Sequence, residues 1–137
     1  MSNTTPSVTL THDAVLIMLT AAVAKAEEIG QPQCAVIVDA SGETLGSIKM
    51  TGAKYLSLHS ARTKARTAAS INNATGGMPE DFAAKLSAAT QNRVTNLPGG
   101  LPIRFDGMLA GAIGVGSGTG DQDIEVGKAA LAAIGAD

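Results

Sequence analysis

The chain has 137 residues and a formal net charge of -2, from 10 lysines and arginines against 12 aspartates and glutamates. This balance argues against nucleic-acid binding, which needs clustered cations, and an aromatic content of 2% leaves few rings on which bases could stack. The length fits one domain, so we expect a single domain over residues 1–137. Cys34 is the one cysteine, and residues 1–6 show no signal-peptide pattern. We therefore expect a cytoplasmic protein with no intrachain disulfide and no membrane partner.

In the first part of the chain, hydrophobic periodicity predicts one helix and three strands. Residues 8–10 alternate and fit a short strand, and residues 11–29 repeat at helical spacing. Apolar runs at 34–38 and 43–50 flank a turn and predict a hairpin. Gly46 weakens the second of these strands and indicates a bulge.

The second part of the chain is expected to contain two helices, a hairpin and a last helix. The hairpin turn is Asp106-Gly107, a dipeptide that favours a tight two-residue turn. Thr119 and Gln122 have the spacing of a capping box, which starts the last helix. The predicted ranges are helices at 54–70 and 79–90, strands at 101–105 and 108–115, and a helix from 120 onward.

This order of elements predicts the fold class. Strands joined by hairpins form antiparallel sheets, and the intervening helices must cover them. We therefore expect an α/β protein of the α+β type, with a five-stranded antiparallel sheet flanked by helices.

Glycines recur at the end of the second hairpin, at positions 111, 114, 116, 118 and 120. Their spacing does not fit a dinucleotide-binding or Walker A loop. Asp121 and Asp123 also place negative charge where a phosphate would meet the helix start. We interpret the series as a close-packed strand followed by a flexible turn.

Candidate chemistry concentrates on the helix at 54–70, which carries four cations and no acid. His59, Arg62 and Arg66 share one helix face, which could bind a carboxylate or form an ordinary solvated surface. The backbone amides of the loop Pro98-Gly99-Gly100 could stabilise an oxyanion, with His59 as the proton-transfer group.

Metal binding is not expected, because His12 and His59 are far apart and no C-x-x-C pattern is present. Cys34 fits a small buried hydrophobe. Methionine can ligate haem iron, but the methionine spacing does not select that role.

Several stretches resemble the GlcG/HbpS/PduO C-terminal family, the group of haem-degrading domains. The matching residues are 10–11, 35–42, 49–53, 64–68, 98–103, 111–115 and 121–123. The resemblance implies a profilin-like α/β/α sandwich and homo-oligomers. Known members bind haem or belong to catabolic operons for glycolate or diols. Thr51 stands where the family commonly has aspartate, so one carboxylate is missing here.

Three functions are compatible with these observations. The first is a small-ligand-binding module that takes haem or an organic acid near an oligomer interface. The second is a small catabolic enzyme, a lyase, hydratase or isomerase, acting on a carboxylate. The candidate site residues are His59 as the catalytic group and Arg62, Arg66, Met50, Pro98, Gly99 and Gly100 as ligand-binding residues. An accessory subunit that assembles through Gly/Ala-rich surfaces is a third interpretation.

Overall fold

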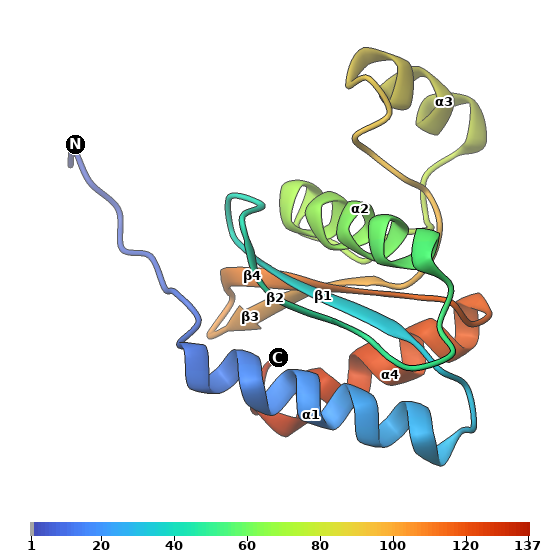
Figure 1. The fold of residues 1–137 in the computed structure, drawn as a ribbon. Coiled ribbons are helices and arrows are strands. Elements are labelled where there is room, and N and C mark those ends of the chain that lie inside the picture. The colour runs from blue at the N-terminus through green and yellow to red at the C-terminus, as the bar shows by residue number, and fades with distance from the viewer. Residues whose placement is uncertain (1) are drawn as a thin grey trace.

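The computed structural model describes residues 2–137 and places four helices and four strands within them. In chain order the elements are α1 (His12–Glu28), β1 (Cys34–Asp39), β2 (Thr44–Lys49), α2 (Tyr55–Ile71), α3 (Glu80–Ala89), β3 (Gly100–Phe105), β4 (Met108–Gly116) and α4 (Gly120–Ala133). The strands form one antiparallel sheet in the order β2-β1-β4-β3. Helix α2 covers one face, and α1 and α4 cover the other (Figure 1). The expected α/β/α sandwich is confirmed.

The sheet has four strands among the described residues, so the prediction of five was wrong. Residues 8–10 were expected to form the fifth strand, and they belong to no ladder. Their alternation has another cause: Leu10 is buried and Val8 is half-buried against the same hydrophobic core. A period of two reports which side chains are buried, and it does not require that the backbone be paired.

The predicted hairpins and the last helix cap are confirmed. Asp106 and Gly107 have φ angles of 51° and 76°, and Phe105 pairs with Met108 across the turn. The Thr119 hydroxyl accepts from the Gln122 amide at 3.2 Å, and the Gln122 side chain accepts from the Thr119 amide at 2.9 Å.

The β1–β2 turn is held by one carboxylate. Asp39 Oδ1 accepts from the Ser41 hydroxyl and amide, both at 2.9 Å, and from the Glu43 amide at 3.0 Å. Burial acts to raise the pKa of Asp39, but these hydrogen bonds to the ionised form together lower it. Beyond the turn the register of β2 shifts beside Gly46, which confirms the predicted bulge.

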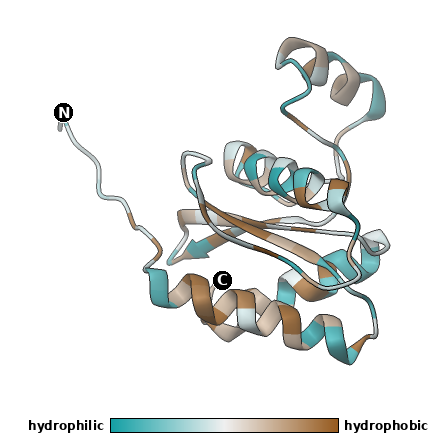
Figure 2. Ribbon diagram, in the orientation of Figure 1, coloured by the Kyte–Doolittle hydropathy of each residue, from teal (hydrophilic) through white to brown (hydrophobic). Residues whose placement is uncertain are grey.

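The two faces of the sheet are packed differently. Larger side chains fill the space between the sheet and helices α1 and α4, among them Met18, Ile37 and Ile113. Alanines dominate the interface with α2, so this helix lies close to the strands. A side chain added at Gly114 would fall on the backbone carbonyl of Ala61, which is why this position needs glycine. Figure 2 shows hydrophobic residues along the central strands and hydrophilic residues spread over α2.

Helix α3 stands apart from the three layers, at the far end of an excursion between α2 and β3 (Figure 1). The side-chain amide of Asn96 closes the base of this excursion. It accepts from the Met78 amide at 3.0 Å and donates to the Met78 carbonyl at 2.9 Å. On the helix itself Ala83 is buried, whereas Phe82 is 52% exposed. We call residues 79–95 the arm.

None of the helices in residues 2–137 combines the length and the apolar character that crossing a bilayer requires.

Candidate functional site

His59 and Arg66 lie on the outward face of α2 and line a broad hollow of about 1140 Å³. Its other wall is the end of the arm, including Arg93. The Nε of Arg66 donates to the carbonyl of Gly42 in the β1–β2 turn at 2.9 Å. Arg62 is half-buried and lines none of the three hollows described in this section.

Pro98 lines a different and smaller hollow of about 250 Å³, together with Lys64. Lys64 follows His59 by five positions, which places the two side chains about 140° apart around the helix. The Gly100 amide donates to Thr75 Oγ1 at 2.9 Å, so this N–H already has a partner outside the loop. The structure therefore brings His59 and Arg66 together but does not bring them to the Pro98 loop. The roles predicted for these residues stay predictions.

A buried ion pair forms the floor of the smaller hollow. The side chains of Lys64, on α2, and Asp123, on α4, are 6% and 3% exposed, and Lys64 Nζ lies 2.9 Å from Asp123 Oδ2. Lys64 also donates to the carbonyl of Val115 at 2.8 Å, and the Gly118 amide donates to the second oxygen of Asp123 at 3.1 Å. The pair thus joins the helix layers on opposite faces of the sheet.

Gly99 packs directly over this pair. Its φ is +121°, and an added Cβ would lie 3.1 Å from Lys64 Nζ and 3.0 Å from the Asp123 Cβ. A larger residue there would disturb both the backbone and the pair. The sequence singled out Gly99 for its amide, whereas the structure shows that it leaves room for the ammonium group.

The sequence interpretation missed the pairing of Lys64 with Asp123, although a signal was present. Ala61, Ala65 and Ala68 surround Lys64 at helical spacing, and all three are buried. A lysine on the apolar face of a helix needs a partner, because burial of an unpaired charge is very costly. The sequence interpretation counted the four cations of this helix together and did not sort them by helix face. It therefore did not recognise that Lys64 needs a partner.

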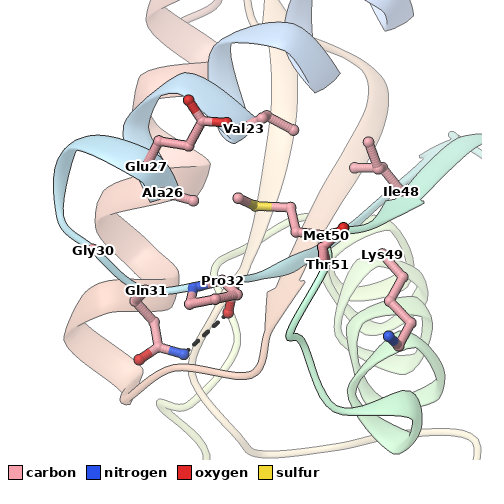
Figure 3. A pocket seen from close by; sticks show the side chains of 10 residues that line it. All are labelled: Val23, Ala26, Glu27, Gly30, Gln31, Pro32, Ile48, Lys49, Met50 and Thr51. Atoms are coloured by element: carbon pink, nitrogen blue, oxygen red, sulfur yellow. Dashed lines mark hydrogen bonds between the residues drawn. The ribbon is translucent and has the colours of Figure 1, made fainter.

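Met50 lies in a third hollow of about 600 Å³, between the end of α1 and the end of β2 (Figure 3). Apolar side chains predominate in the lining, including Val23, Pro32 and Ile48. The thioether of Met50 accepts a hydrogen bond from the backbone amide of Gln33 at 3.4 Å. The side chain of Lys49 points away from Met50, toward α2, so its ammonium group lies outside this hollow (Figure 3).

Cys34 is buried at the start of β1, as the sequence predicts for a small hydrophobe. Burial raises the pKa of its thiol, and the nearby Lys49 offsets part of that rise. Across residues 2–137, no three His, Cys, Asp or Glu side chains gather in a group that could hold a metal ion.

Comparison with known proteins gives consistent matches. A family model described as "Haem degrading protein HbpS-like" matches residues 10–132. Among curated proteins, the corrinoid adenosyltransferase PduO of Citrobacter freundii is 31% identical over 94% of this chain, which spans 40% of that protein's length.

Solved structures show the same fold over nearly the whole chain. The Klebsiella pneumoniae protein ORFY has a TM-score of 0.90 and 28% identity, with 98% of this chain and 97% of that chain covered. A complex of PduOC with haem has a TM-score of 0.88 and 29% identity, with 95% and 98% covered. HbpS has a TM-score of 0.83 and 33% identity, with 95% and 93% covered. The family resemblance read from the sequence is thus confirmed: this chain belongs to the HbpS-like family.

Proposed function

We propose that this protein binds haem in the Met50 hollow. The observation that carries the proposal is a mostly apolar cavity of about 600 Å³ with one thioether inside it (Figure 3). Ligand pockets of small molecules and cofactors have volumes of this order, with apolar walls and few polar groups. The solved complex of PduOC with haem, a related chain, supports the same ligand.

The residues of the hollow fit a haem group in their chemistry. Ile48, Val23 and Pro32 offer apolar surface to a macrocycle. Thioether sulfur is one of the ligands that proteins offer to haem iron, and Met50 would supply it here. Bound haem would supply a redox-active iron, and this chain would orient it and limit its access to water.

The His59 hollow is a second candidate place for haem. It is larger, about 1140 Å³, and combines an imidazole with the guanidinium groups of Arg66 and Arg93. These groups suit an iron ligand and two propionate contacts. Its lining is more polar than that of the Met50 hollow, so we rank it second.

Titration with hemin distinguishes the two sites. We expect a saturable Soret shift for the native protein. Met50→Leu keeps the apolar volume and removes the thioether, so it should move the Soret band and weaken binding if haem lies in the Met50 hollow. His59→Ala is the matched variant for the other hollow, and His12→Ala is a control, because His12 is exposed and lines neither hollow. Absence of a saturable shift refutes haem binding altogether.

We also propose that the protein forms a homo-oligomer through β2. This strand is at the edge of the sheet, and Leu45 and Ile48 are exposed on it. An exposed edge strand with apolar side chains is a ready surface for pairing. Light scattering should give a mass that is a multiple of 13.7 kDa, and Leu45→Lys should lower it. A native protein that stays monomeric at high concentration refutes this proposal.

The enzymatic alternative gains no support from this geometry. That alternative requires His59 to lie beside the Pro98-Gly99-Gly100 loop. In the structure His59 and Pro98 line different hollows.

A further inference from the structure

The hollow above the Lys64–Asp123 pair is polar and small. Its volume is about 250 Å³, which suits a molecule of a few heavy atoms and not a macrocycle. Its side chains include three serines and two lysines but only one carboxylate. The lining residues with polar side chains are Lys54, Ser57, Ser60, Lys64, Ser117 and Asp123.

Two helices begin at this hollow. Helix α2 starts after Lys54 and α4 starts at Gly120, and both residues line the hollow. The first amides of a helix have no partner within it and carry partial positive charge. Helix α2 has neither a side-chain cap nor an acidic residue in its first turn, so its positive end is not compensated.

The aspartates near the start of α4 do not cancel the partial positive charge of the two helix starts. Asp123 is already neutralised by Lys64 and accepts from the Gly118 amide. Asp121 is exposed and does not line the hollow. Asp121 and Asp123 therefore do not prevent an anion from binding at the start of α4. Lys54 forms no ion pair with any of residues 2–137, so its charge is uncompensated.

A buried lysine supplies the central donor. The ammonium group of Lys64 uses two of its three N–H donors, on Val115 and Asp123, and it lines the hollow. The third donor has no partner among the described residues. A ligand oxygen in the hollow would accept from it.

The side-chain amide of Gln33 has no hydrogen-bond partner among the described residues and lies next to Gly118. Gln33 is 2% exposed, and neither its Oε1 nor its Nε2 has a hydrogen-bond partner within residues 2–137. Its Nε2 lies 2.7 Å from where a Cβ on Gly118 would stand, and Gly118 lines the hollow. Buried polar groups without partners are costly, so we expect a polar group to approach Gln33 beside Gly118, although Gln33 itself does not line the hollow.

We propose that this hollow binds a small oxyanion, the carboxylate of an organic acid or a phosphate group. Lys64 and the first amide of α4 hold the oxyanion, the positive end of α2 adds its dipole, and Lys54 attracts the oxyanion from solvent. The serine hydroxyls complete its hydrogen bonds. This site is separate from the Met50 hollow and does not depend on haem binding.

The test is a two-dimensional amide NMR titration of the full chain with inorganic phosphate and, separately, with acetate. Chloride keeps the ionic strength constant, and titration to about 50 mM fills even a site of millimolar Kd. We expect saturable shifts at the amides of Ser57, Gly118 and Gly120. Saturation by phosphate alone or by acetate alone supports the proposal and identifies the preferred oxyanion.

Two lysine variants make the test specific. Lys54 is exposed, so Lys54→Met leaves the fold intact and should weaken binding about fivefold, the upper range for an exposed charge. Lys128→Met removes the same charge from an exposed position on α4 outside the hollow and should leave binding unchanged. The proposal is overturned if neither anion saturates these amides, or if both variants weaken binding equally.

Discussion

The Lys64–Asp123 pair allows a quantitative test of the structure. Lys64→Met keeps most of the aliphatic stem and removes the ammonium group. It leaves Asp123, 3% exposed, with the Gly118 amide as its remaining hydrogen-bond partner, and it leaves the Val115 carbonyl without its donor. Removing one partner of a buried pair costs about 3–5 kcal/mol, against a total stability of about 5–15 kcal/mol. For a chain of this length, we expect the midpoint of thermal unfolding to fall by about 10–20 °C.

The assay is equilibrium unfolding in urea followed by far-ultraviolet circular dichroism, because the chain has no tryptophan to report by fluorescence. The single variant Asp123→Leu and the double variant of Lys64→Met with Asp123→Leu complete a double-mutant cycle. The double variant removes both charges, so it should be markedly more stable than Lys64→Met alone. The reasoning is refuted if Lys64→Met costs less than about 1 kcal/mol, or if the two substitutions add within about 0.5 kcal/mol.

Three further predictions concern the core, the thiol and the turn. Gly114→Ala should prevent stable folding, because the new methyl group falls on the α2 backbone, whereas Gly77→Ala, with open space around it, should fold normally in a circular dichroism comparison. Cys34 should resist a thiol reagent at pH 7 until denaturant is added, since it is fully buried with a raised pKa, and rapid labelling of the native protein would contradict its placement. Carbon NMR should show the pKa of Asp39 below the usual range of an aspartate, because hydrogen bonds to its ionised form lower it. Because its pKa is lowered on folding, its stabilisation is present above about pH 4 and lost as the pH falls through the folded value, and Asp39→Asn should remove that pH dependence.

Local chemistry explains why most of the fold could be predicted. The Asp106-Gly107 turn and the Thr119 capping box depend on neighbouring residues only, and both appear as predicted. The extra strand at residues 8–10 was wrong because alternation also arises when a chain without a strand partner buries every second side chain.

The candidate site was harder to predict, because its residues meet through tertiary contacts. Lys64 and Asp123 are 59 positions apart, and no local pattern joins them. The shared face of His59 and Arg66 followed from helical spacing and is present. The Pro98 loop lies away from the His59 hollow because of the position of β3 in the sheet. Spacing along the chain does not predict that position.

The arm has a consequence for how members of this fold can diverge. Asn96 fastens its base to Met78, so residues 79–95 form a module whose length can change while the two ends stay in register. Residues 90–94 of that module supply one wall of the His59 hollow. Insertions or deletions there would resize the cavity and leave the sandwich untouched, so ligand size can evolve independently of the core.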